Sequence, residues 1–304
     1  MNLRYASLVA ACSLCAGCPS GHVLYAGQAT SGPAGFEIWD IKVKDGAPAG
    51  SPVNLTQSAG DDVDADWNQP KGKIAFASDR SGTFEIYSMD PDGSNVSPLT
   101  NNTAMDRFPS WEPNGDRMVY ASDQSGNFEI MRMYASGSNP GQLTNNSCLD
   151  TEPAWSPDGA RIVFVSNCAG GSDLEIFVMD ANGGGITQLT TRPTKDDFHP
   201  TWSPDGTRIA FESVPTGGSA HVNTEILIMD ANGSNLQPIS TAVPPTGDLI
   251  HPAWSSDGNF IAVGMTDSSG DYNIYTVNLT NGGLRIVVDQ PATQWSPAWG
   301  DPSN

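Results

Sequence analysis

The sequence predicts an all-β protein, a six-bladed β-propeller with four antiparallel strands in each blade. Three observations predict this class: one unit repeats along the chain after residue 21, each unit contains hairpin-type turn motifs, and incomplete units stand at both chain ends. The unit is marked by a tryptophan, found at Trp67, Trp111, Trp155, Trp202, Trp254 and Trp299. Successive tryptophans are 44 to 52 residues apart, and periods of about 40–50 residues with four short strands are typical of propeller blades.

The clearest copy of the unit runs from residue 152 to residue 190. Its tryptophan, Trp155, is a large wedge for the space between neighbouring sheets. The Ser-Pro-Asp-Gly group at 156–159 predicts a hairpin turn, because proline presets φ, aspartate caps its own turn and glycine adopts a positive φ. Residues 161–166 and 174–180 then predict the second and third strands, and a short outer strand ends in Leu-Thr at 189–190.

The two ends of the chain together predict the remaining blade. Residues 22–56 carry a second, a third and an outer strand but no tryptophan strand, whereas residues 293–301 carry a tryptophan strand with nothing after it. Joining these pieces closes the ring and removes exposed sheet edges. The predicted blades are therefore residues 22–56 with 293–301, 62–100, 106–144, 150–190, 197–240 and 249–288.

Residues 1–17 predict an export signal, and residues 18–304 the propeller. One positive charge, Arg4, precedes an apolar run that is too short to span a bilayer. The run ends Cys15-Ala16-Gly17-Cys18, which resembles the lipobox of bacterial lipoproteins, with Cys15 standing where that pattern usually has leucine. This resemblance implies that Cys18 is lipidated and that a lipid anchor holds the chain in the periplasm, at the outer membrane or at the cell surface. The alternative is ordinary cleavage nearby, which would release a free protein.

Two cysteines, Cys148 and Cys168, remain beyond the leader. Residues that pair across the turn at 158–159 should have numbers that sum to about 317, and these two sum to 316. They therefore lie nearly opposite each other at the far end of the hairpin, within bridging distance. In an oxidising compartment this predicts a disulfide in the fourth blade.

The charge balance is strongly acidic, with 14 lysines and arginines against 34 aspartates and glutamates and a net charge of −20. Nucleic-acid binding depends on clustered lysine and arginine, so this balance excludes a nucleic-acid partner. It also disfavours adhesion to anionic lipids. It fits a well-hydrated monomer, or a surface that attracts cations or a basic partner.

The order Trp, Ser-Pro-Asp-Gly, then Met-Asp-x-x-Gly after the third strand, resembles the TolB-type propeller repeat over nearly all of residues 18–304. TolB carries an additional N-terminal α/β domain, for which this chain has no room. The resemblance implies a periplasmic or envelope module that binds another protein at one mouth of the ring. Similar propellers also accompany prolyl-oligopeptidase-type hydrolases, but the chain has no Gly-x-Ser-x-Gly nucleophile motif. We therefore expect a non-catalytic protein.

The positions just before each tryptophan are the candidate site, because inner strands of a propeller line its central channel. Three residues before each tryptophan stand Asp64, Phe108, Glu152, His199, His251 and Ser296. We expect this ring to bind an envelope protein at the channel mouth. Since residues two apart share a strand face, Asp62, Asp64 and Asp66 should point the same way.

Two histidines beside carboxylates also suggest a divalent cation in the channel. Asp64, Glu152, His199 and His251 offer ligands that suit zinc, manganese or iron. A metal-dependent, lyase-like carbohydrate-active enzyme or a glycan-binding propeller is therefore the alternative function, and the other reading is that these residues are structural and no cofactor is bound.

Other recurrent residues predict blade architecture. The aspartate five residues before the tryptophan and the glutamate that opens each third strand both repeat too regularly to form a single site. The fifth blade differs by longer segments at 214–224 and 241–248, and long loops on one blade are where a propeller acquires its own partners.

Overall fold

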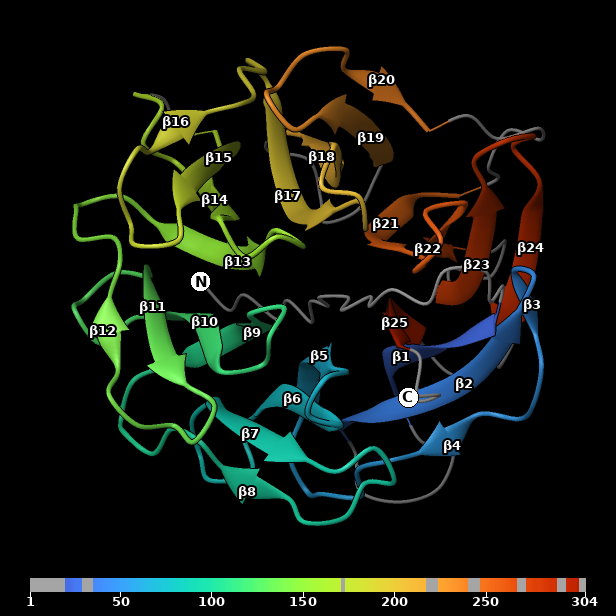
Figure 1. The fold of residues 1–304 in the computed structure, drawn as a ribbon, viewed down its shortest axis with the longest axis horizontal. Coiled ribbons are helices and arrows are strands. Elements are labelled where there is room, and N and C mark those ends of the chain that lie inside the picture. Colours follow the sequence, from blue (N-terminus) through green and yellow to red (C-terminus); the bar gives the residue numbers. More distant parts are fainter. Residues whose placement is uncertain are drawn as a thin grey trace.

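The computed structural model describes residues 20–28, 35–170, 173–216, 224–239, 247–266, 272–288 and 294–300. The regular elements of these residues are 25 β-strands in six antiparallel sheets. No helix long and apolar enough to cross a membrane occurs in them. The sheets surround a central axis as the blades of a ring, which confirms the predicted six-bladed propeller (Figure 1).

Five blades are continuous in sequence, and their strands follow one another from the inner to the outer position (Figure 1). Blade two comprises β5 (Asp62–Asn68), β6 (Lys73–Ser78), β7 (Glu85–Met89) and β8 (Ser97–Pro98). Blade three comprises β9 (Asp106–Trp111), β10 (Arg117–Ser122), β11 (Glu129–Tyr134) and β12 (Gly141–Gln142). Blade four comprises β13 (Asp150–Trp155), β14 (Arg161–Ser166), β15 (Glu175–Asp180) and β16 (Thr187–Gln188). Blade five comprises β17 (Lys195–Trp202), β18 (Arg208–Pro215), β19 (Glu225–Asp230) and β20 (Gln237–Pro238). Blade six comprises β21 (Leu249–Trp254), β22 (Phe260–Thr266), β23 (Tyr272–Asn278) and β24 (Leu284–Val288).

Blade one joins the two ends of the chain, as predicted. It comprises β25 (Gln294–Gly300), β1 (Ser20–Gln28), β2 (Phe36–Lys44), β3 (Ala47–Pro48) and β4 (Val53–Asn54). The last strand, β25, lies beside β1 (Figure 1). The two strands pair antiparallel, with Val23 opposite Trp299. Because β1 is thereby paired on both sides, it does not expose an edge.

A second contact closes the ring further out. The turn between β2 and β3 reaches blade six, where Thr276 Oγ1 donates to the carbonyl of Gly46 at 2.5 Å. Arg285 Nη1 donates to the carbonyl of Asp45 at 2.9 Å. Gly46 has a φ of 72°, and a Cβ there would lie 2.6 Å from Cε1 of Phe260. Only glycine fits this close approach of blade one to blade six.

The Ser-Pro-Asp-Gly groups form the predicted hairpin turns. In blade four, Ser156 Oγ accepts the N–H of Arg161 at 2.9 Å and donates to Asp158 Oδ1 at 2.6 Å. Asp158 Oδ1 accepts the N–H of Ala160 at 3.0 Å, and Gly159 has a φ of 68°. The paired strands then place Trp155 opposite Ile162, which gives the expected sum of 317.

The tryptophans fill the spaces between blades. Trp202 of blade five shares a buried cluster with Val163 and Val165 of blade four. The guanidinium of Arg161, at the start of β14, lies 4.6 Å from the centre of the same indole ring. Trp202 thus contributes apolar contact and a cation–π contact across a blade boundary.

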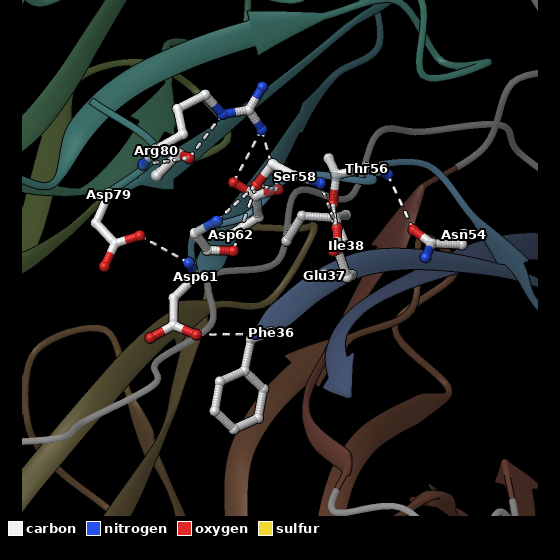
Figure 2. Close-up of polar contacts among 12 residues, drawn as sticks. Phe36, Glu37, Ile38, Asn54, Thr56, Ser58, Asp61, Asp62, Asp79 and Arg80 are labelled. Atoms are coloured by element: carbon white, nitrogen blue, oxygen red, sulfur yellow. Dashed lines mark hydrogen bonds and ion pairs between the residues drawn. The ribbon is translucent and has the colours of Figure 1, made fainter. Parts of the chain in front are cut away.

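The recurrent carboxylates belong to the blade architecture. Ile38 donates its N–H to Thr56 Oγ1 at 2.9 Å, and Thr56 Oγ1 donates to Glu37 Oε2 at 2.7 Å (Figure 2). Arg80 Nη2 contacts both carboxylate oxygens of Asp62 at 2.9 and 3.0 Å (Figure 2). The same backbone-to-threonine bond recurs in blades two, three and four, to Thr100, Thr144 and Thr190. These bonds secure the short outer strands to the rest of each blade.

The predicted disulfide between Cys148 and Cys168 is present, with a Cα–Cα distance of 5.4 Å. It joins the segments just outside β13 and β14. Such a bond persists in oxidising compartments, so it indicates export from the cytosol. The predicted leader and Cys18 lie outside the described residues.

Candidate functional site: the inner ring

A β-bulge shapes each of the five complete inner strands. The pairing with the second strand shifts register between the residues that stand four and one before the tryptophan. One non-glycine residue of each bulge adopts a left-handed conformation, with φ between 50° and 56°: Asp64, Phe108, Glu152, His199 and His251. These are five of the six predicted ring residues. The sixth, Ser296, lies on β25, whose side chains are not described.

The bulge corrects one expectation about strand faces. On β5, Asp62 lies opposite Ser78 whereas Asp66 lies opposite Ala75. Ser78 and Ala75 are three residues apart on β6 and therefore occupy opposite faces of the sheet. Asp62 and Asp66 consequently do too, and the prediction that all three aspartates of this strand point the same way was wrong. The period-two rule assumes a regular strand, and the extra bulge residue breaks it.

Backbone-to-carboxylate bonds link the bulges of neighbouring blades. The N–H of Phe108 donates to Asp64 Oδ2 at 3.4 Å, and the N–H of His199 donates to Glu152 Oε2 at 2.6 Å. In blade six, the N–H of His251 donates to Glu212 Oε2 at 3.1 Å. These bonds join blade two to three, blade four to five and blade five to six, through side chains that are buried or nearly so.

Asp64 is held by an arginine of the next blade. Arg107 Nε lies 2.9 Å from Asp64 Oδ2, and Arg107 Nη2 lies 3.1 Å from Asp64 Oδ1. This bidentate pair is buried, and the Arg107 guanidinium also lies 4.6 Å from the ring centre of Phe108. The two parallel N–H···O bonds of such a pair give both oxygens of the buried carboxylate a charged hydrogen-bond donor. Asp64 thus belongs to an ion pair between blades two and three.

The other charged ring residues gather between blades four, five and six. The rings of His199 and His251 meet edge to face with centroids 3.9 Å apart. His199 Nδ1 lies 3.2 Å from Glu212 Oε2, and His199 Nε2 lies 3.6 Å from Glu152 Oε1. His251 Nε2 lies 3.9 Å from the same oxygen of Glu212. His199, Glu212 and His251 each place one potential ligand atom within 4.8 Å of the others.

Burial and neighbouring charge act in opposite directions here. Burial raises the pKa of the Glu152 carboxyl, against the attraction of His199. Burial by itself lowers the pKa of His199, but Glu152 and Glu212 outweigh it, and the net direction is upward. The two carboxylates therefore favour the charged form of the imidazole, against the desolvation of the site.

Sequence reasoning missed Glu212, although the repeat contained a signal for it. Glu212 lies on β18 opposite Phe198, four residues before the tryptophan. The equivalent positions of the other continuous blades hold Ala77, Ala121, Val165 and Gly264. A buried carboxylate at a position that is otherwise small and apolar needs a partner. A comparison of second strands, as well as inner strands, would have found it.

Aspartates gather at the end of the ring where the inner strands begin, which we call the mouth face. Among the described residues, Asp61, Asp79, Asp123 and Asp248 lie in its loops, and Asp196 lies at the start of β17. Several organise the loops: Asp123 Oδ1, for example, accepts the N–H of Met105 at 2.8 Å. Burial, together with repulsion from Asp61 and Asp62, raises the pKa of the Asp79 carboxyl. Blade five carries the two longer segments, 214–224 and 241–248. Residues 217–223 and 240–246, which make up most of them, lie outside the described residues.

The fold and the inner ring define a class, the six-bladed propellers built from TolB-type repeats. The sequence pattern of the TolB beta propeller domain matches residues 18–146 and 151–245. The chain belongs to this family. No curated protein matches it.

Solved structures share the fold at low sequence identity. TolB from Acinetobacter baumannii is 22% identical with a TM-score of 0.78, over 92% of this chain and 67% of that one. A putative TolB from Agrobacterium tumefaciens is 19% identical with a TM-score of 0.58, over 73% and 88%. An oligogalacturonate lyase in complex with manganese is 12% identical with a TM-score of 0.58, over 94% and 85%. At these identities the likeness concerns the fold alone.

Proposed function

We propose that this protein is a non-catalytic, protein-binding propeller of the bacterial cell envelope, and that its partner binds at the channel mouth. The observation that carries the proposal is the position of the residues that depart from the repeat. Turns, tryptophans and outer strands are nearly uniform among the blades, whereas the residue three before the tryptophan is an aspartate, a phenylalanine, a glutamate or a histidine. These side chains are buried or nearly so, so their variety would shape the inner wall beneath a contact that the exposed loops of the mouth make.

Charge indicates the kind of partner. The chain has a net charge of −20, and the mouth face carries the loop aspartates described above. A basic segment of a partner would be attracted to this face and would bind faster at low ionic strength. The ring residues Asp64, Phe108, Glu152, His199, His251 and Ser296 would then form the inner wall beneath the contact. The disulfide supports an extracytoplasmic location, and membrane attachment through Cys18 belongs to the same proposal.

The metal-dependent carbohydrate-active alternative has less support. Its structural neighbour, the oligogalacturonate lyase, is 12% identical to this chain. An identity this low carries over no substrate or catalytic residue. The histidines of the inner ring need a separate account, which does not depend on a carbohydrate substrate.

Site-specific photocrosslinking in intact host cells tests the proposal. A photoreactive amino acid is placed at Met105 or Ser125, which are exposed on mouth-face loops, and at Asn114 or Ser136, which are exposed on the opposite face. All four positions lie in loops that adjoin strands of blade three, so the two pairs differ in the face of the ring on which they lie. We expect one protein adduct from the mouth face and none from the other. Equal adducts from both faces, or adducts from the opposite face alone, would contradict a mouth-binding partner.

A further inference from the structure

We propose that His199, Glu212 and His251 form a binding site for a divalent metal ion of the zinc class, with Glu152 orienting His199. This site shares Glu152, His199 and His251 with the inner wall beneath the partner contact proposed above, but it binds an ion and not the partner. It also differs from the four-ligand set that the sequence suggested, because Asp64 pairs with Arg107 and Glu212 takes its place.

The spacing of the three ligand atoms suits such an ion. Zinc binds histidine nitrogen and carboxylate oxygen at about 2.0–2.2 Å in tetrahedral geometry, so two of its ligand atoms lie about 3.3 Å apart. Glu212 Oε2 lies 3.2 Å from His199 Nδ1 and 3.9 Å from His251 Nε2. All three ligand atoms lie within 4.8 Å of one another, so side-chain rotations that draw the two imidazoles toward the shared oxygen would complete the site.

Glu152 supplies what a metal-bound histidine usually has on its other nitrogen. If His199 binds through Nδ1, its Nε2–H can interact with a carboxylate, and Glu152 Oε1 lies 3.6 Å away. Carboxylate–histidine–metal arrangements of this kind fix the ring orientation and increase the basicity of the ligand. The backbone reinforces the contact, since the N–H of His199 donates to the other oxygen of Glu152 at 2.6 Å.

The carboxylates around the inner ring differ in the side chains that they face. Asp64 pairs with Arg107. Glu152 and Glu212 lie beside His199, and Glu212 also lies beside His251. A divalent cation can neutralise two buried carboxylates while the imidazoles act as neutral ligands.

Departure from the repeat supports a dedicated role for Glu212. The other continuous blades carry alanine, valine or glycine at this position and still form the same second strand. Glu212 also accepts the N–H of His251, so a purely structural role is the competing account. The variant Glu212→Gln separates the two, because glutamine keeps a hydrogen-bond acceptor but is a poor zinc ligand.

Titration of the purified full chain with zinc chloride tests the site. The protein is first treated with EDTA and dialysed, and binding is followed by calorimetry and by the absorption of cobalt(II) added in place of zinc. We expect one ion per chain, a raised Tm, and a cobalt spectrum of four-coordinate type. Glu212→Gln and His251→Phe should weaken zinc binding by at least about 100-fold, and Glu152→Gln by about 10- to 100-fold.

The repeat provides the variants and the control. Phenylalanine at position 251 is the residue that blade three carries at the equivalent Phe108, so the inner strand should still fold, which circular dichroism verifies. His22→Gln removes a histidine from blade one and should leave zinc affinity unchanged. Failure of the wild-type chain to bind zinc, or binding that survives both Glu212→Gln and His251→Phe, would overturn the inference. Neither result would affect the crosslinking outcome on the mouth face.

Discussion

Buried carboxylates in the inner strands accept backbone N–H groups from the next blade. Asp66 is 1% exposed, and its Oδ2 accepts the N–H of Trp111 at 2.6 Å. Burial raises the pKa of Asp66 to about 7, against the hydrogen bonds from Trp111 and Trp67 that favour the charged form. A residue that links two blades therefore changes its charge near neutral pH.

Asp66 predicts a pH-dependent stability. Its folded pKa of about 7 lies above the ordinary value of 3.8, so the folded state binds the proton more tightly. The resulting stabilisation is complete below the unfolded pKa and is lost as the pH rises towards 7. Relative to Asp66→Asn, which keeps an acceptor for Trp111, the wild type should lose up to about 4 kcal/mol between about pH 4 and pH 8. Urea unfolding of both proteins across this range measures the difference, and parallel curves would refute the assignment.

At the residue scale the sequence predicted part of the site. Equal positions in neighbouring blades made Glu152, His199 and His251 candidates for one cluster, and the structure brings these three together. Glu212 escaped notice because it lies on the second strand and approaches the ring only through the pairing of β17 with β18. Asp64, also a predicted ligand, instead pairs with Arg107 of the next blade.

At the scale of single elements, the outer strands are short and depend on side-chain bonds. In blade four, Thr190 Oγ1 accepts the N–H of Ile176 at 2.9 Å and donates to Glu175 Oε2 at 2.6 Å. The outer strand itself, β16, has two residues. A buried threonine thus makes connections that a longer strand would make through its backbone.

Removal of this hydroxyl should destabilise the blade. Thr190→Val keeps the shape of the side chain but leaves a buried N–H and a buried carboxylate with one partner fewer. We expect a loss of about 1–3 kcal/mol in the free energy of unfolding. Thr187→Val, at an exposed position of β16, should change it by less than about 0.5 kcal/mol. Equal effects of the two substitutions in urea unfolding would show that the hydroxyl of Thr190 is not structural.

The disulfide stabilises the hairpin of blade four from its open end. Cys148 and Cys168 are 20 residues apart in sequence, and closing a loop of this length stabilises the folded state by about 3 kcal/mol in the chain-entropy account. The double variant Cys148→Ser with Cys168→Ser should unfold at correspondingly lower urea concentration. The wild type should match it after reduction. If reduction did not shift the urea unfolding curve of the wild type, this role of the disulfide would be contradicted.

Strand positions were predictable because their local chemistry repeats. Ser-Pro-Asp-Gly turns, tryptophan wedges and Leu-Thr endings each constrain the backbone locally, and together they located blades and pairing register. The bulges were not predictable in this way. The residues that adopt a positive φ there are aspartate, phenylalanine, glutamate and histidine rather than glycine, so composition does not mark the position, and the faces of Asp62 and Asp66 were assigned wrongly.

At the scale of the whole molecule, stability depends on joining blade one to blade six. The pairing of β25 with β1 does this near the axis, and the turn at Asp45 and Gly46 does it further out. A ring with an open seam would expose strand edges on both sides of the gap. The two closures should therefore contribute to the stability of all blades.

Gly46→Ala tests the outer closure. Alanine would combine an unfavourable positive φ with a clash against Phe260. Gly72→Ala is a matched control, because Gly72 also has a positive φ, of 57°, but no atom lies within 4 Å of the position that its Cβ would take. We expect Gly46→Ala to lose about 1–3 kcal/mol more than Gly72→Ala in urea unfolding. Equal losses would show that the contact with blade six is not tight.

Amide hydrogen exchange of β1 tests the closed ring most directly. If β25 pairs with β1, the β1 amides between His22 and Gly27, apart from the irregularity at Tyr25 and Ala26, are bonded to β2 or to β25 and should exchange as slowly as those of β6, a second strand within a continuous blade. If the ring is open, β1 is an edge strand, and its alternate amides, those directed away from β2, should exchange at rates typical of exposed loops. Residue-resolved exchange on the full chain distinguishes these outcomes. Protection on both sides of β1 between His22 and Gly27 is the result that the closed propeller predicts, and alternating fast exchange there would contradict it.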